Sequence, residues 1–300
     1  MQAQFFCFGL GYSATVLGRK LLAEGWRVSG TTRSPERAAE LRQEGFTVHV
    51  FGAAHPLADT QRALSGARHV LISPPPDADG DPVLAAHHHA LATLAGDWRW
   101  LGYLSTTGVY GDRGGGWVDE TAPLAAISDR GLRRVAAEQA WQDFAASTGA
   151  PLHIFRLPGI YGPGRNPFRA LRDGTARRID KAGQVFSRIH VEDLASALAA
   201  SMARPQPGAL YNICDDEPAP QHAVIAHAAE LLGIAPPPLE RFADAATTMS
   251  PMARSFYAES KRVRNNRMKR ELGIILRYPT YREGLKALMN EGRDFPNGPK

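Results

Sequence analysis

The sequence predicts an α/β protein, with a parallel sheet covered by helices on both faces and a small C-terminal lobe. An apolar run at residues 5–8 leads through a glycine-rich turn into a helical pattern. Further apolar runs alternate with helical patterns as far as residue 157, and beyond residue 164 arginine becomes frequent. Regular alternation of strands and helices is typical of parallel sheets, in which helices form the crossover connections.

The composition is that of a soluble globular chain. Of its 300 residues, 44% are apolar and 22% charged, which allows one large domain or a large and a small one. Two cysteines exclude a disulfide framework. We find no leader pattern and no membrane-spanning run, so we expect a cytosolic protein without membrane contact. The net charge of +5 comes from scattered arginines, which suits an anionic small molecule better than nucleic acid.

The glycine-rich turn has the pattern Gly9-x-Gly11-x-x-Ala14. Gly9 can take backbone angles that a β-carbon forbids, Gly11 allows close approach to a pyrophosphate, and Ala14 lets the helix pack near the strand. The N–H groups at the helix start, at Tyr12 and Ser13, would face the phosphates. We therefore predict a Rossmann-type dinucleotide site that includes Gly9, Gly11, Tyr12 and Ser13. The alternative is a bare strand-to-helix turn.

The end of the second strand, residues 26–33, indicates which dinucleotide is bound. An NAD site typically carries an acid here for the ribose 2′-hydroxyl, whereas an arginine can pair with a 2′-phosphate. This strand ends in Thr32 and Arg33, with Arg37 one helical turn further on. We predict NADP, with NAD less favoured. The alternative is that both arginines form a solvated helix start.

The next strands and helices continue the alternation, with helices at 36–44 and before Gly66 and strands at 46–51 and 69–73. Ser73, Pro74 and Pro75 follow the fourth strand at its carboxyl end, where we expect them to form a wall of the cofactor site. The helix at 81–95 contains three successive histidines at residues 87–89. Their side chains diverge by about 100° each on a helix, so we predict no metal site.

A strand at 100–104 runs into Ser105-Thr106-Thr107-Gly108-Val109-Tyr110-Gly111. Here the chain resembles the extended short-chain dehydrogenase/reductase superfamily, which contains nucleotide-sugar epimerases and dehydratases and whose segment reads S-S-[ST]-x-x-V-Y-G. The resemblance implies that Thr106 hydrogen-bonds the reacting substrate oxygen. We also place Ser105 among the cofactor-binding residues.

The superfamily's Tyr-x-x-x-Lys signature would fall on the helix at 129–147, and the Glu-Gln ending of the matching segment aligns the tyrosine with Arg130 and the lysine with Arg134. Arginine has no proton to exchange at ordinary pH, so Arg130 can hold charge but cannot act as general acid or base. Arg134 could clamp a ribose or phosphate. The alternative is that it pairs with Glu138. We expect this helix to bury one apolar stripe: Leu132, Val135, Ala136, Ala140 and Phe144.

The strand at 152–157 is followed by a segment that resembles the superfamily's R-x-x-x-x-Y-G-P, with Arg156 and Tyr161-Gly162-Pro163. The resemblance implies that this segment, Pro158 included, closes over the nicotinamide. Tyr161 is a candidate replacement for the missing proton donor. A packing role is the favoured alternative, because buried phenols commonly do no chemistry.

Beyond Gly164 the sequence predicts a substrate lobe rich in arginine. Six arginines suited to phosphate or carboxylate recognition fall between residues 165 and 188, namely Arg165, Arg169, Arg172, Arg177, Arg178 and Arg188. Residues 186–195 match the superfamily's I-H-V-x-D-[LV]-A segment, which re-enters the sheet domain. We therefore assign 1–164 and 186–204 to the Rossmann-type domain, and 165–185 and 205–300 to the lobe. The capping box at Thr280–Glu283 predicts a final helix.

Two functions remain open from the sequence. One is an NADP-preferring oxidoreductase or epimerase of an atypical branch of the superfamily, acting on an anionic substrate, for which nucleotide-linked compounds are a candidate class. The other is a non-catalytic protein that senses NADP(H) or holds a partner. The superfamily resemblance also implies a homodimer through the helices at 82–95 and 129–147.

Overall fold

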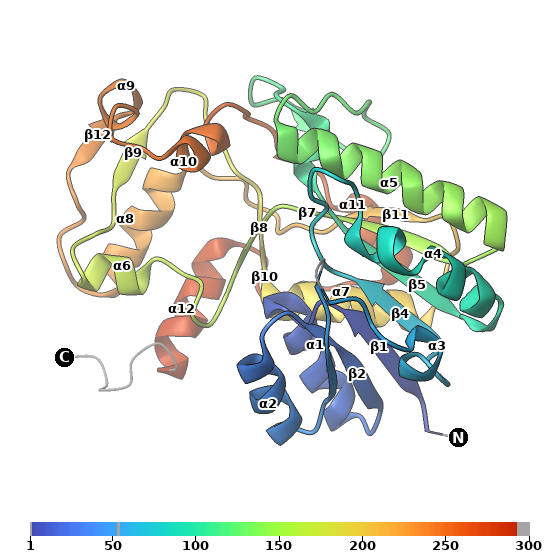
Figure 1. Cartoon of the computed structure of the whole chain (residues 1–300). Coiled ribbons are helices and arrows are strands. Elements are labelled where there is room, and N and C mark those ends of the chain that lie inside the picture. The colour runs from blue at the N-terminus through green and yellow to red at the C-terminus, as the bar shows by residue number, and fades with distance from the viewer. Residues whose placement is uncertain (1, 53–54, 293–300) are drawn as a thin grey trace.

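A computed structural model describes residues 2–52 and 55–292 of the chain (Figure 1). The sheet and its helices occupy one side of the molecule, and a smaller group of helices and short strands lies beside them. Three further short elements are the 3-10 helices η1 (Ala95–Asp97) and η2 (Thr107–Tyr110) and the strand β6 (Trp117–Val118).

Seven strands form the central sheet in the order β11-β7-β5-β4-β1-β2-β3, and all neighbours are parallel. The order reverses at the β1/β4 pair, where ligands of open α/β sheets bind beyond the carboxyl ends of the strands. This confirms the predicted Rossmann-type fold. The strands are β1 (Gln4–Phe8), β2 (Arg27–Thr32), β3 (Thr47–Val50), β4 (His69–Ile72), β5 (Trp100–Thr106), β7 (Leu152–Leu157) and β11 (Leu210–Asn212).

Helices cover both faces of the sheet, and each face has its own apolar core. One face packs against α1 (Tyr12–Ala23), α2 (Pro35–Gln43), α7 (Val191–Ala203) and α11 (Asn266–Leu272). The other packs against α3 (Thr60–Ala63), α4 (Pro82–Leu94) and α5 (Asp129–Thr148).

The buried face of α5 differs from the predicted stripe. Leu132 is 52% exposed, whereas Ala137, Glu138 and Trp141 are buried together with Phe144. The buried face is rotated relative to the predicted stripe, because it includes a polar residue, Glu138, whose partner lies on a strand. Apolar periodicity alone does not reveal such a residue.

The lobe is built around a third core, in which Phe168, Val224, Tyr281 and Leu285 are buried. The returning strand β10 (Arg188–His190) pairs in parallel with β8 (Gly159–Tyr161). The other lobe elements are α6 (Phe168–Arg172), β9 (Arg178–Asp180), α8 (Gln221–Leu231), β12 (Leu239–Arg241), α9 (Phe242–Ala245), α10 (Pro251–Phe256) and α12 (Tyr281–Glu291).

The lobe boundary at residue 205 needs correction. β11 completes the edge of the central sheet beside β7, where Tyr211 stacks on Phe155 at 6.0 Å between ring centroids. Next, β13 (Arg262–Val263) pairs with β6, and α11 packs its Met268 and Leu272 into the sheet core. Residues 205–300 therefore pass between the two parts of the molecule more than once.

Asp193, in the segment that resembles I-H-V-x-D-[LV]-A, ties the start of α7 to the chain leading into α12. Its carboxylate accepts hydrogen bonds from the backbone N–H groups of Arg277 at 2.8 Å and Tyr278 at 3.0 Å. His190 caps α7 by accepting from the Glu192 N–H, and burial lowers the His190 pKa to about 4, which agrees with a structural role.

Within the described part of the chain, no helix combines the length and the apolar character needed to cross a bilayer.

We predict that Asp193→Asn lowers the free energy of unfolding by about 2 kcal/mol, because a buried backbone N–H loses its acceptor. Urea denaturation measures the change. The matched control is Glu192→Gln, which weakens an ion pair to the exposed Arg277 and should cost less than about 1 kcal/mol. Equal losses in the two variants would contradict the anchoring role of Asp193.

Candidate cofactor and substrate site

The glycine turn lies between the ends of β2 and β4. Gly9 has φ +81°, and its N–H donates to the Thr31 hydroxyl at 2.9 Å. A β-carbon on Gly9 would lie 3.1 Å from the Pro74 ring, so this proline wall does adjoin the turn. Ser73 is half-buried and donates its backbone N–H to Phe8 O, and Pro75 is exposed.

The N-terminus of α1 has the form of an anion cradle. Gly11 is the N-cap residue, no side chain among the described residues caps the helix, and its first turn carries no acid. A β-carbon built on Gly11 meets no atom within 4 Å, so the space above the turn is open. The first N–H groups of an α-helix point out of its N-terminus, toward the space above the turn. These residues fit a dinucleotide pyrophosphate.

Arg33 extends from the end of β2 and is exposed, next to the half-buried Thr32. Among the described residues, Arg33 forms no ion pair, whereas Arg37 pairs with Glu40 at 2.6 Å. The carboxylate of Glu36 accepts from the Ser34 hydroxyl at 2.5 Å in the first turn of α2. Of the two arginines, Arg33 is therefore the one available to a 2′-phosphate.

Thr106 ends β5 on the side where the sheet binds ligands. Its side-chain oxygen accepts from the Gly108 N–H at 3.1 Å, and the residue is half-buried. The Thr106 hydroxyl proton can therefore still be donated to a substrate oxygen.

Ser105 has different surroundings from Thr106. The residue is 4% exposed, and its hydroxyl donates to Glu138 at 2.5 Å. Successive strand residues face opposite sides of a sheet, so the side chains of Ser105 and Thr106 point in different directions. The assignment of Ser105 to the cofactor site stays a prediction.

Glu138 and Arg156 form a buried ion pair behind the site. Arg156 donates to the two carboxylate oxygens of Glu138 at 2.7 and 3.1 Å, and the side chains are 5% and 2% exposed. Arg156 also donates to the Tyr110 hydroxyl at 3.0 Å, and Tyr110 donates to Asn212 at 2.8 Å. The network connects α5, β7, η2 and β11. The sequence shows that both residues are charged, but nothing in it indicates that they pair with each other.

Arg134 does not pair with Glu138, so that alternative is wrong. It donates to the Tyr103 hydroxyl at 3.1 Å and to the Leu104 carbonyl oxygen, both on β5. Its guanidinium lies 5.6 Å from the centroid of the Tyr103 ring. Arg134 thus fastens α5 to the strand that carries Thr106.

Arg130 is exposed at the start of α5, with its guanidinium 4.6 Å from the centroid of the Phe256 ring on α10. Nearby, the Ser128 hydroxyl donates to Glu259 at 3.3 Å. The beginning of α5 therefore faces the lobe, and Arg130 lies where the two parts of the molecule meet.

Tyr161 has the surroundings of a packing residue. Its hydroxyl donates to the Thr280 carbonyl oxygen at 3.3 Å, and its ring meets His190 edge-on at 5.2 Å. Burial raises the pKa of the phenol well above its usual range. Pro158, between β7 and β8, is half-buried.

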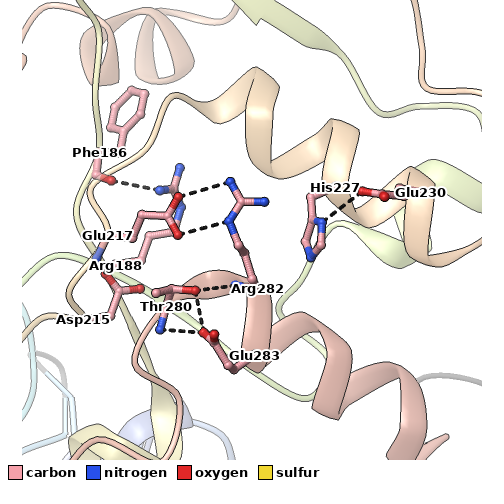
Figure 2. A network of polar contacts seen from close by, with 9 residues as sticks. All are labelled: Phe186, Arg188, Asp215, Glu217, His227, Glu230, Thr280, Arg282 and Glu283. Carbon is pink, nitrogen blue, oxygen red and sulfur yellow. Dashed lines mark hydrogen bonds and ion pairs between the residues drawn. The ribbon is translucent and has the colours of Figure 1, made fainter.

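Most of the lobe arginines are engaged within the protein. Arg177 pairs with Glu240 at 2.5 Å, and Arg178 donates to the Pro237 carbonyl oxygen at 3.0 Å. Arg188 is 6% exposed and donates to Phe186 O at 2.8 Å (Figure 2). It also donates to Gln221 at 3.2 Å. Arg177, Arg178 and Arg188 thus each have a partner within the protein, and the expectation that part of the arginine set touches a ligand stays a prediction.

No group of histidine, cysteine and acidic side chains in the described residues could hold a metal ion. His87, the buried member of the histidine run, instead contacts the Thr60 hydroxyl at 2.9 Å.

Residues 89–214 match the model of the NAD dependent epimerase/dehydratase family. A structure from Silicibacter pomeroyi, described as a functionally unknown conserved protein, is 54% identical with a TM-score of 0.90, over 97% of this chain and 99% of that one. Protein YeeZ of Escherichia coli is 27% identical over 90% of this chain and 94% of its own length. A dTDP-glucose 4,6-dehydratase from Bacillus anthracis in complex with NAD has the same fold, at 16% identity and a TM-score of 0.76 over 98% and 97% of the two chains.

We predict that Glu138→Gln lowers the free energy of unfolding by about 3 to 5 kcal/mol, because the buried Arg156 charge loses its counter-ion. Chemical denaturation followed by tryptophan fluorescence measures this. Glu40→Gln, which breaks an exposed pair, is the control and should cost no more than about 1 kcal/mol. A loss in Glu138→Gln as small as that in the control would refute the role of the network.

Asp215 should make stability fall as pH rises. The residue is 1% exposed, and burial raises its pKa to about 8 despite the opposing effect of the nearby Arg188 (Figure 2). The folded state therefore binds a proton that the unfolded state releases near pH 4, so between about pH 4 and 8 stability declines by at most about 1.4 kcal/mol per pH unit. In Asp215→Asn this decline should disappear. Parallel stability profiles of wild type and variant across that range would contradict the assignment.

Proposed function

We propose that this chain, whose residues 89–214 match the model of the NAD dependent epimerase/dehydratase family, belongs to the extended short-chain dehydrogenase/reductase superfamily and is an NADP-preferring oxidoreductase or epimerase for an anionic small molecule. A nucleotide-linked substrate is the favoured class. The observation that carries the proposal is the open glycine turn at the start of α1, on the same edge of the sheet as the Thr106 hydroxyl.

The residues at this edge of the sheet form two groups, one for the cofactor and one for the substrate. Gly9, Gly11 and the N–H groups of Tyr12 and Ser13 would hold the pyrophosphate, with Pro74 as a wall. Thr106 would donate its hydroxyl proton to the reacting oxygen of the substrate and so orient it. When bound, the nicotinamide cofactor would supply or accept a hydride.

Arg130 would hold substrate charge, because it is exposed at the junction with the lobe. Neither Arg130 nor the buried Tyr161 suits the proton transfer, so a water molecule or the substrate itself would complete it. This differs from the usual chemistry of the superfamily, in which a tyrosine supplies the proton.

The alternative function is a non-catalytic NADP(H)-binding sensor or partner-binding protein. The engagement of Arg134 with β5 favours it, because this residue occupies the position at which the superfamily places its lysine. In a sensor, the cofactor site would be retained and Thr106 would have no chemical role.

The two functions are separated by calorimetric titration with NADP⁺, NADPH, NAD⁺ and NADH, followed by a panel of nucleotide sugars and other anionic carbonyl compounds assayed by nicotinamide absorbance. An enzyme should turn over at least one compound, and Thr106→Ala should then lower kcat by about 100-fold. Binding without turnover would favour the sensor. Failure to bind any of the four nucleotides would reject both functions.

The choice of NADP predicts that Arg33→Ala weakens NADP⁺ by about 10-fold and leaves NAD⁺ unchanged, because only NADP carries the 2′-phosphate. Arg37→Ala is the matched control and should change neither affinity, since Arg37 is already paired with Glu40. Equal weakening of both nucleotides by Arg33→Ala would contradict the assignment.

A further inference from the structure

The loop between β8 and α6 returns to the start of α1. The Tyr12 hydroxyl donates to the Pro163 carbonyl oxygen at 3.0 Å, across 151 positions of sequence. A β-carbon on Gly162 would lie 2.6 Å from the Tyr12 hydroxyl oxygen, so the Tyr12 side chain reaches the Gly162 backbone as closely as a glycine allows. The first residue of the phosphate-binding helix is therefore fastened to the loop that leads into the lobe.

This loop has a fixed shape. Gly162 and Arg165 exchange two backbone hydrogen bonds, at 3.1 and 3.0 Å, which close a tight turn. The Asn166 side chain donates to the Gly162 carbonyl oxygen at 3.0 Å and reinforces it. These hydrogen bonds therefore fix the backbone of Arg165 in the turn, beside α1.

Arg165 places its guanidinium over the Tyr12 ring, 5.0 Å from the ring centroid. A cation over the face of a tyrosine is attracted by the ring, which orients the side chain. In the described part of the chain, no carboxylate pairs with Arg165. It differs in this from Arg169 and Arg177, which pair with Asp173 and Glu240. The unpaired charge is thus held over the side chain of the first residue of α1.

We propose that Arg165 and Tyr12 form a clamp on the cofactor pyrophosphate, with the α1 N–H groups on one side of the anion and the Arg165 guanidinium on the other. This inference rests on the proposed nucleotide-binding function and adds a specific residue to it, supplied by the lobe side of the molecule. Guanidinium groups suit this task because their planar N–H donors match two phosphate oxygens at once. In this arrangement Tyr12 is a positioning residue, and Arg165 is the group that touches the ligand.

The test measures dissociation constants of NADP⁺, NAD⁺ and ADP-ribose by calorimetry for wild type, Arg165→Ala and Arg165→Lys. Arg165→Ala should weaken all three by about 10-fold, because all three contain the pyrophosphate. Arg165→Lys should recover part of the loss, since lysine keeps the charge but not the planar fork. Arg169→Ala is the control: its arginine is exposed four residues further on, is paired with Asp173, and should change nothing.

A second variant separates the clamp from a general effect on folding. Tyr12→Ala removes the ring that orients Arg165, so in the Tyr12→Ala background the further change Arg165→Ala should weaken NAD⁺ by less than it does alone. Thermal melting of each variant checks that the fold is intact.

The outcomes are distinct. A loss confined to NADP⁺ would assign Arg165 to the 2′-phosphate, and a loss that spares ADP-ribose would assign it to the nicotinamide half; either overturns the clamp. Unchanged affinities in Arg165→Ala would reject the clamp while leaving the proposed function in place. If the wild-type protein bound none of the three compounds, both the clamp and the proposed function would be rejected.

Discussion

The buried ion pair between Glu138 and Arg156 is the constraint on which the substrate half of the site depends. It joins α5 to β7, and through Tyr110 and Asn212 it reaches η2 and β11. Removing two charges from water is costly, so such a pair persists only when its geometry is nearly complete. The bidentate contact and the Ser105 hydroxyl provide that geometry. The carboxyl end of β5, where Thr106 lies, is therefore held in one position relative to α5.

The proposed cofactor half of the site is built differently. Its donors would be backbone N–H groups, and Gly9, Gly11 and Pro74 would give it its shape. Backbone donors carry no net charge and cannot titrate, so this half would depend on small residues rather than on ion pairs. Its charged groups would be Arg33 at the end of β2 and Arg165 in the loop between β8 and α6, which are both exposed.

The parts of the structure that could be predicted from the sequence are those that depend on neighbouring residues. The alternation of strands and helices, the glycine turn and the capping box at Thr280 are local patterns, and the structure has them as predicted. Contacts between distant residues cannot be predicted in this way. A local pattern offers Glu138 only Arg134, four positions away, as a partner, whereas its partner in the structure is Arg156 on a strand. The buried face of α5 includes Glu138 and leaves Leu132 exposed. Three residues of β11 carry too little periodicity to show which sheet they join. The lobe arginines could be counted but not assigned, because Glu240 and Gln221 are brought to them only by the fold.

The late position of β11 and α11 in the chain has a consequence for folding during synthesis. β11 completes the edge of the main sheet at residues 210–212, and α11 covers part of the same face at residues 266–272. A ribosome that has released the first 205 residues has therefore supplied six of the seven strands, with β7 left as an unpaired edge and its apolar neighbours uncovered. Exposed edges of this kind favour association with other chains. Nascent or truncated forms that end before α11 are expected to need protection from aggregation, even though the glycine turn lies far upstream of β11 and α11.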